Sequence, residues 1–265
     1  MKYLLLPLLF SFPPPAPAVG TTPLISEDLP TEPTAELSAL QGTIIRSTGA
    51  IEADVEAFRA LLGNPVNGAV PGTQPTGHRE INWDGVPAAV TNVLDFPAAF
   101  FNTNSPRGLV YDRSNRGLEV SDARFTDINP TYAAEFNPFS GGKLFSPLRT
   151  NKSEVRFFVP GSDTEAAVTG FGAVFSDVDV QGSAGLILIG DDGRTLARLV
   201  APVRSDARGA SFIGVVFPGT VISRVLVITG SGLLAADELD ISQGGRHDLV
   251  VLDDFLYGEP KQTGP

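Results

Sequence analysis

The apolar residues follow a helical period early in the chain and an extended one later. Five of them recur at the three- and four-residue intervals of one helix face: Ile51, Val55, Phe58, Leu61 and Leu62. Ser47 or Thr48 is available to cap the first turn, and Gly63 stands where a helix would stop. The pattern predicts one amphipathic helix over residues 48–63.

After a loop rich in Pro, Gly and Asn at 64–77, short apolar runs alternate with turn residues. The runs cover 154–159, 167–175, 185–189, 196–200, 210–217, 222–228 and 248–256. The Gly190-Asp191-Asp192-Gly193 turn predicts a hairpin, because Asp and Gly adopt positive φ at low cost. Residues 186–189 are apolar without alternation, which indicates a strand covered on both faces. The prediction is an all-β fold, a two-sheet sandwich of jelly-roll type with an N-terminal helix.

The domain boundaries follow from these elements. Residues 64–260 are expected to form a single β-sandwich domain, since all-β domains of about 200 to 250 residues commonly fold as one unit. Within it, 79–145 is dense in Asn, Pro, Phe and Arg and is assigned only to early strands with long loops. Residues 19–47 have few large apolar side chains and are predicted to be a flexible leader, and 261–265 a short tail.

Residues 1–18 have the order of a secretory signal peptide. Lys2 precedes an apolar run, and Ala16-Pro17-Ala18 offers a cleavage site after Ala18. The alternative is a disordered proline-rich N-terminus, because several prolines interrupt the apolar run. No other segment reaches the roughly 18 apolar residues of a membrane span. We therefore expect a secreted or extracellular protein.

The composition of the chain argues against several kinds of site and partner. The chain has no cysteine, which excludes disulfides and thiolate zinc sites and leaves stability to a hydrophobic core. Its formal net charge of -11 argues against nucleic acid as a partner, because phosphate binding depends on clusters of Lys and Arg. The same acidity is explained equally well by solubility.

Four aspartates flank the β-rich block and form the predicted metal site: Asp177, Asp179, Asp253 and Asp254. Calcium takes about 6 to 8 oxygen ligands, so a fold that joined the two ends of the block would create a calcium site. The segment from 177 to 182 matches the opening of a calcium loop, but Leu188 at the twelfth position excludes an EF-hand. Asp253 and Asp254 are adjacent, so in a strand they should point to opposite faces. Alternatively, these acids are solvated and discourage edge pairing.

A second candidate site, for a ligand, comprises Glu80, Asn82, Trp83 and Asp84. In a strand its three oxygen-bearing side chains share one face, suited to a cation or to sugar hydroxyls, and the indole can stack on a sugar ring. The alternatives are structural. Arg79 and Arg107 would hold the two acids in buried pairs, and the tryptophan would lie in the core.

Several separated motifs, in one order, resemble a family of uncharacterised exported bacterial proteins. They span residues 77–87, 100–102, 105–108, 125–132, 170–179 and 253–260. The resemblance covers about Phe58 to Pro260 and implies no established activity. Some members carry a C-terminal sorting anchor of the PEP-CTERM type, whereas this chain stops at Pro265, so surface attachment is not implied.

Signatures of common enzymes do not occur. There is no Gly-x-Ser-x-Gly elbow, no His-Glu-x-x-His motif and no Gly-Lys-Ser/Thr phosphate loop, and two histidines exclude a multi-histidine metal centre. The predicted function is a secreted, non-enzymatic binding or surface protein, stabilised by calcium and recognising extracellular polysaccharide. The alternatives are a secreted glycan-active hydrolase, with paired carboxylates about 5 to 9.5 Å apart, and a structural extracellular matrix protein.

Overall fold

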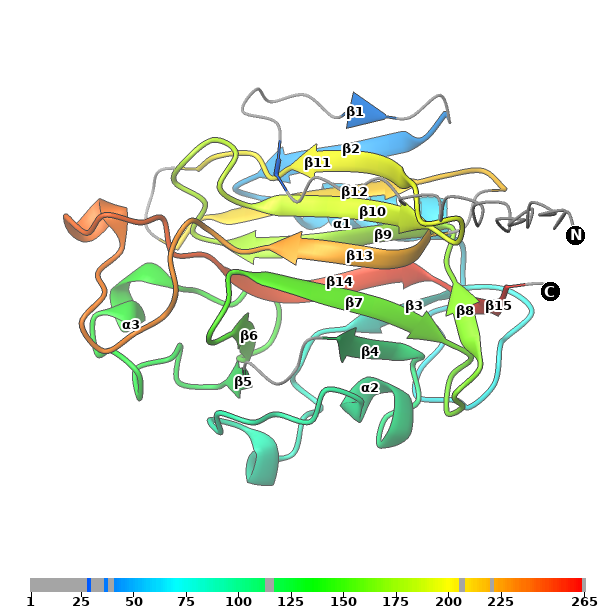
Figure 1. The fold of residues 1–265 in the computed structure, drawn as a ribbon, viewed down its shortest axis with the longest axis horizontal. Helices are drawn as coiled ribbons and strands as arrows, with labels where there is room; N and C mark the ends of the chain where they lie inside the picture. The colour runs from blue at the N-terminus through cyan, green and yellow to red at the C-terminus, as the bar shows by residue number, and fades with distance from the viewer. Residues whose placement is uncertain are drawn as a thin grey trace, which may run out of the picture.

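The computed structural model describes residues 28–29, 36–37, 41–112, 117–204, 208–219 and 222–263. Over these residues the chain forms two antiparallel sheets that pack face to face as a β-sandwich (Figure 1). This confirms the predicted all-β, two-sheet class. The predicted signal peptide lies outside the described residues.

The strands divide between a first, eight-stranded sheet and a second, seven-stranded sheet. The first contains β1 (Glu36–Leu37), β4 (Leu109–Asp112), β7 (Lys152–Phe158), β8 (Glu165–Ala167), β10 (Gly185–Gly190), β11 (Thr195–Val200), β13 (Ile222–Ile228) and β15 (Lys261–Gln262). The second contains β2 (Thr43–Thr48), β3 (His78–Ile81), β5 (Leu118–Ser121), β6 (Leu144–Pro147), β9 (Gly170–Ser176), β12 (Ala210–Val216) and β14 (Val251–Gly258). The first sheet runs β1-β11-β10-β13-β7-β8-β15 with β4 beside β7, and the second runs β2-β12-β9-β14-β6-β5 with β3 beside β14.

The hairpin and the doubly covered strand are both observed. β10 and β11 pair antiparallel across the turn at 190–193. Leu186 and Leu188 belong to the main core between the sheets, while Ile187 and Ile189 pack into a separate apolar cluster. Both faces of β10 are therefore apolar because both are covered, as the missing alternation predicted.

Large aromatic side chains fill the main core. Trp83 stacks on Phe145 with ring centroids 4.3 Å apart and an interplanar angle of 5°, and Tyr111 and Phe255 pack around them. Each such side chain, fully buried, contributes about 1.5 to 3 kcal/mol, and each aromatic pair about 0.5 to 1.5 kcal/mol more. The core thus supplies the stability that a chain without disulfides requires.

The predicted helix is α1 (Glu52–Leu62), which ends at Gly63 with a φ of 91°. Its buried face packs on the outer surface of the second sheet, where a Cβ at Gly172 or Gly214 would lie within 2.8 Å of the Phe58 ring. The glycines thus make room for the helix. Ile51 occupies the N-cap position without a side-chain hydrogen bond.

The prediction of a flexible leader over 19–47 is wrong for its last residues. Thr43–Thr48 forms β2, which pairs with β12 in a register that sets Ile44 opposite Val215. An edge strand is held by backbone hydrogen bonds to its neighbour, so its low apolar content concealed it. The same strand contains Ser47 and Thr48, which explains why neither caps the helix.

The segment 79–145, predicted to hold early strands with long loops, contains β4 and β5, most of β3 and the start of β6, together with short helices. These are η1 (Ala88–Val90), α2 (Phe100–Thr103) and α3 (Tyr132–Glu135). A further turn, η3 (Ile241–Gln243), lies in the long connection between β13 and β14. No helix among the described residues has the length and apolar character needed to cross a membrane.

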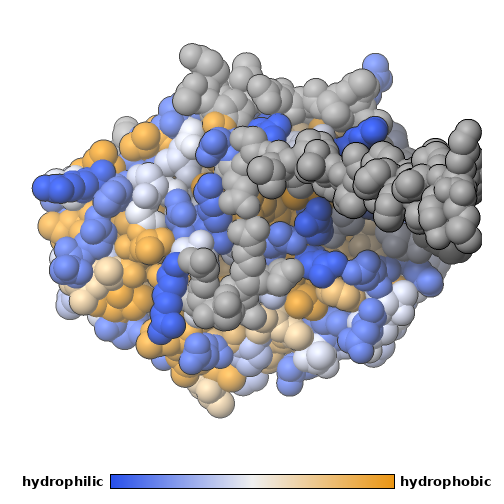
Figure 2. All heavy atoms as spheres, in the orientation of Figure 1, coloured by the Kyte–Doolittle hydropathy of each residue, from blue (hydrophilic) through white to orange (hydrophobic). Residues whose placement is uncertain are grey.

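One end of the molecule is formed by α3 and the connection over 231–247, which lie side by side (Figure 1). Apolar residues gather on the surface at this end (Figure 2), where Leu233, Leu239 and Ile241 are 41%, 38% and 40% exposed. Beneath them lies the group of acidic residues described next.

Candidate metal centre

Five carboxyl groups meet at this end of the sandwich, and we call them the acidic cluster: Glu135, Asp177, Asp179, Asp240 and Asp248. They come from separate segments, namely α3, the turn after β9, the residue before η3 and the approach to β14. Two overlapping triads compose the cluster, Glu135–Asp177–Asp240 and Asp179–Asp240–Asp248. Within each triad, one carboxylate oxygen per residue lies within 4.8 Å of the others. Asp240 belongs to both triads.

Asp177 is the most unusual member. It is fully buried, and no described N–H or O–H group donates a hydrogen bond to either of its carboxylate oxygens. The neighbouring Glu135 carboxyl can hydrogen-bond to it only if one of the two groups holds a proton. A buried carboxylate without a donor is costly, and contact with a cation would offset that cost.

The backbone at Asp177 explains how it reaches the cluster. Its φ is 72°, in the left-handed region that Asp tolerates better than most residues, and its N–H donates to Gly209 O at 2.9 Å. β9 therefore ends at Ser176. Asp177 and Asp179 lie beyond the end of this strand, and the chain after Ser176 brings both into the cluster.

Asp248 is held in place by hydrogen-bond donors. Its carboxylate accepts from the Asp179 N–H at 3.2 Å, from the Val180 N–H at 3.0 Å and from the Ser183 hydroxyl. The chain that carries Asp179 is thereby fixed to the approach to β14. Asp248 is fully buried, so this anchoring keeps it in one orientation.

Asp240 and Glu135 are anchored in a similar way. Asp240 accepts from the Ser242 N–H at 2.8 Å and from the Leu249 N–H at 2.7 Å. Glu135 Oε2 accepts from the Ser242 hydroxyl at 2.8 Å. The cluster is therefore built in advance by its own protein contacts, which is the preorganisation that a metal site requires.

The electrostatics of the cluster are repulsive. Burial, the contact with Glu135 and the charges of Asp240 and Asp179 all raise the pKa of Asp177. Burial and the charges of Asp240 and Asp248 raise the pKa of Asp179. Removing these carboxyls from water and setting them side by side disfavours their ionised forms, and a bound cation would reverse that effect.

The donor set selects the kind of cation. All five side chains offer carboxylate oxygen, and the chain has no cysteine. Hard cations such as calcium prefer oxygen, and calcium accepts the six to eight ligands that bidentate carboxylates supply in irregular geometry. Four of the five residues are at most 2% exposed: Glu135, Asp177, Asp240 and Asp248. A closed site of this kind suits a structural ion.

Asp253 and Asp254, which the sequence placed with Asp177 and Asp179, belong to a different site. Both carboxyls meet Ser140, whose hydroxyl lies 3.4 Å from Asp253 Oδ1 and 2.5 Å from Asp254 Oδ1. The expectation that they face apart is wrong, because the register of β14 against β9 shifts between Leu252 and Phe255. Such a bulge turns two successive side chains toward one side.

This second pair is part of a network under α1. Asp253 Oδ2 accepts from the Phe139 N–H at 2.5 Å, and burial together with the charge of Asp254 raises its pKa. Arg59 lies 3.8 Å from Asp254 and 2.8 Å from Glu80. Asp253 and Asp254 thus have a basic residue and backbone donors in contact with them, whereas no described N–H or O–H group donates to the carboxylate of Asp177.

The predicted ligand-binding residues do not converge on one surface. Glu80 pairs with Arg59 and His78, while Asp84 accepts from the Gly142 N–H at 2.8 Å. Asn82 is exposed. β3 ends at Ile81, so the strand alternation that would align the three side chains stops there.

Trp83 lies in the core, as the structural alternative held. It is 1% exposed, and its indole N–H donates to Asp253 O at 2.7 Å. Its backbone φ of 66° turns the chain inward after β3. Because Phe145 stacks on one face of the indole, the ring is not available as a platform for a sugar.

Arg79 has a different partner from the one expected. Its guanidinium binds Glu259 through two bonds of 2.7 and 2.6 Å, and Nη1 also donates to the carbonyls of Gly68 and Val70. The pair is buried and ties the loop after α1 to the end of β14. Arg79 therefore forms a buried ion pair, as the structural alternative predicted, but its partner is Glu259 and not Glu80.

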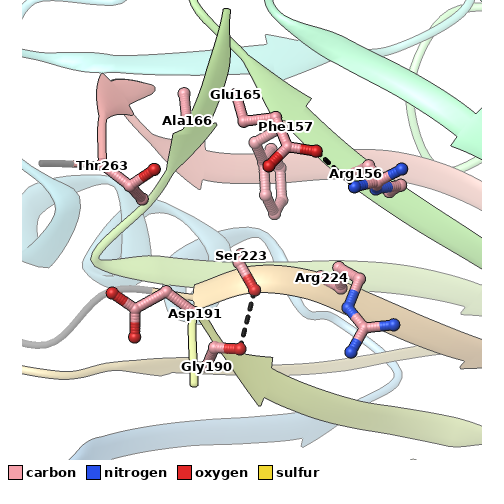
Figure 3. Close-up of a pocket in the computed structure, with 9 residues that line it drawn as sticks. All are labelled: Arg156, Phe157, Glu165, Ala166, Gly190, Asp191, Ser223, Arg224 and Thr263. Atoms are coloured by element: carbon pink, nitrogen blue, oxygen red, sulfur yellow. Dashed lines mark hydrogen bonds and ion pairs between the residues drawn. The ribbon is translucent and has the colours of Figure 1, made fainter. Parts of the chain in front are cut away.

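A polar recess of about 170 Å³ lies beside β7, β8 and β13 (Figure 3). Arg156 and Arg224 lie opposite each other in its wall. Arg156 pairs with Glu165 at 2.6 Å, and Arg224 lies 3.5 Å from Glu154. Because each arginine is already paired, the recess has a weaker claim to a charged ligand than the acidic cluster.

Three members of the acidic cluster were not predicted as ligands: Glu135, Asp240 and Asp248. They are distant from Asp177 in sequence, and only the fold brings them together. A signal existed for Asp248, an acid that begins the apolar run into β14.

Comparisons with protein-family models, with curated proteins and with solved structures find no match to this chain. Function is therefore inferred from its own residues and geometry.

Proposed function

We propose that the protein is an exported, non-enzymatic β-sandwich in which calcium, bound at the acidic cluster, stabilises the fold. The observation that carries this proposal is the carboxylate of Asp177, fully buried among other carboxyls without a donor. An uncompensated buried charge costs several kcal/mol, and a divalent cation offsets that cost for several carboxylates at once.

The enclosed position of the cluster favours a structural ion. A catalytic metal keeps a coordination position open to water or substrate, whereas these carboxyls lie beneath α3 and the 231–247 connection. Extracellular modules bind calcium with dissociation constants of about 10⁻⁴ to 10⁻³ M. This range suits export, which we propose from the signal-like pattern over 1–18 and from the family resemblance.

For the protein as a whole we propose a binding or surface role, with extracellular polysaccharide as the partner. The polar recess beside β7, β8 and β13 (Figure 3) is the surface we assign to it in place of Trp83. A glycan hydrolase is disfavoured as a use for Asp253 and Asp254. They are at most 2% exposed and close enough to share a hydrogen bond, whereas retaining glycosidases hold their carboxyls about 5 Å apart.

The test is thermal unfolding of the chain from Val19 onward in chelator, in about 10 mM calcium and in about 10 mM magnesium, which is 100-fold a dissociation constant of about 10⁻⁴ M. A ligand at 100-fold its dissociation constant adds about 2.7 kcal/mol, which raises Tm by roughly 5 to 10 °C for a domain of this size. We expect the rise in calcium, its loss in Asp240→Asn, and its retention in Asp163→Asn, an exposed acid outside the cluster. An unchanged Tm in calcium would refute the calcium proposal.

A further inference from the structure

The acidic cluster contains two positions for a cation. One is bounded by Glu135, Asp177 and Asp240, and the other by Asp179, Asp240 and Asp248. We propose that the cluster binds two divalent cations that share Asp240, an inference that rests on the calcium site proposed above. The shared carboxylate has two oxygens, each with lone pairs beyond the one that accepts an N–H, so it can serve both ions.

Each position has its own unsatisfied oxygen. Among the described residues, neither carboxylate oxygen of the fully buried Asp177 has a donor in the first position, and Oδ1 of the half-buried Asp179, which lies beside the Asp240 carboxyl, has none in the second. A single ion in the first position would satisfy Asp177 and leave Asp179 unchanged. Each of the two overlapping triads thus contains a buried oxygen without a donor, which is the geometric basis for two ions.

The charge of the acidic cluster also indicates two ions. Its five carboxylates, when ionised, carry a charge of about -5 in a site that is largely closed to water. One divalent ion would leave three negative charges buried, and a second reduces them to one. Burying several like charges without compensation is far more costly than burying one, so the first ion leaves a strong field for the second.

The two positions differ in character. In the second, Asp248 already accepts two N–H bonds and a hydroxyl bond, which offset part of its negative charge. In the first, Asp177 accepts none from the described residues. The first position is thus the more negative one, and we expect its ion to bind more tightly.

The experiment counts calcium ions bound per chain, by isothermal titration of the chelator-treated protein with calcium chloride. We expect two ions for the natural chain and for Asp163→Asn. Asp179→Asn should keep one ion at the tighter affinity, and Asp177→Asn should lose the tighter step. Circular dichroism of each variant confirms that it is folded.

The outcomes separate the two proposals. A natural chain that binds one calcium ion, with the Tm rise intact, overturns the two-ion arrangement and leaves the calcium-stabilised fold standing. A chain that binds none overturns both. Two ions whose stoichiometry is unchanged in Asp177→Asn and in Asp179→Asn place the ions elsewhere and also overturn the inference.

Discussion

The variant Asp177→Asn should be more stable than the natural protein in chelator and less stable than the natural protein in calcium. Without an ion, burial and the neighbouring carboxyls raise the pKa of Asp177 from 3.8 to about 9. Such a group destabilises the folded state increasingly as the pH rises above 3.8, until the folded pKa is reached. Asparagine keeps the shape and removes the ionisation, so in chelator at neutral pH the variant should be more stable than the natural protein.

The magnitude follows from the shift in pKa. At about 1.4 kcal/mol per pH unit, an isolated group with this shift would cost about 4 kcal/mol at pH 7. Because neighbouring carboxyls share the protons of the cluster, we expect a gain of about 2 kcal/mol, or roughly 4 to 8 °C in Tm. Calcium at 100-fold its dissociation constant instead adds about 2.7 kcal/mol to the free energy of unfolding of the natural protein. The variant lacks one charged ligand, so calcium should stabilise it less.

The assay is thermal unfolding at about pH 7 in chelator and in about 10 mM calcium, 100-fold a dissociation constant of about 10⁻⁴ M, followed by circular dichroism. Asp163→Asn is the matched control, since it removes the same charge from an exposed loop and should follow the natural protein in both buffers. A variant less stable than the natural protein in chelator would mean that the Asp177 carboxylate is already well satisfied. That result would refute the reasoning.

Three further predictions concern the rest of the fold. Glu259→Gln should destabilise the protein by about 3 to 5 kcal/mol in urea unfolding, because it leaves the buried Arg79 charge without its partner; a change below about 1 kcal/mol would contradict this. Burial opposes protonation of His78, but the hydrogen bonds of its ring to Glu80 and to a backbone carbonyl outweigh burial and raise its pKa. Protonated His78 therefore stabilises the folded state. This stabilisation is complete below pH 6.5, the unfolded pKa, and is lost as the pH rises through the pKa of the folded state. Urea unfolding should therefore show a cost of His78→Asn that is larger at about pH 5.5 than at about pH 9. Trp83→Phe should cost about 1 to 3 kcal/mol in the same assay through the lost indole hydrogen bond and leave the glycan binding proposed above unchanged; loss of that binding at full stability would place the indole at a ligand site.

Much of the fold could be predicted because its signals are local. The helical spacing that ends at Gly63 and the turn at 190–193 each appear within a few residues, and both are observed. β2 was missed because an edge strand relies on a neighbour, β12, that lies far away in the chain. A period within one segment predicts its conformation and does not identify its partners.

The candidate site was predicted only in part, for the same reason. Asp177 and Asp179 are in the acidic cluster, while Asp253 and Asp254 lie further along β14 beside Ser140, where a bulge that no sequence pattern signals turns both toward one side. Their actual partners depend on how α3 and the 231–247 connection fold over the end of the sandwich. Likewise Arg79 binds an acid at the opposite end of the chain, which adjacency in sequence could not indicate.

The origin of the acidic residues has a consequence for biogenesis. Glu135, Asp177 and Asp240 lie on segments far apart in the chain, which has no cysteine, so ions at this point would cross-link it as disulfides cross-link many secreted proteins. Unlike a disulfide, this cross-link needs no oxidant and closes wherever calcium is plentiful. Under our proposal the protein's own hydrogen bonds would shape this end while calcium is scarce, and ions bound outside the cell would then stabilise it, so that secretion itself would complete the fold.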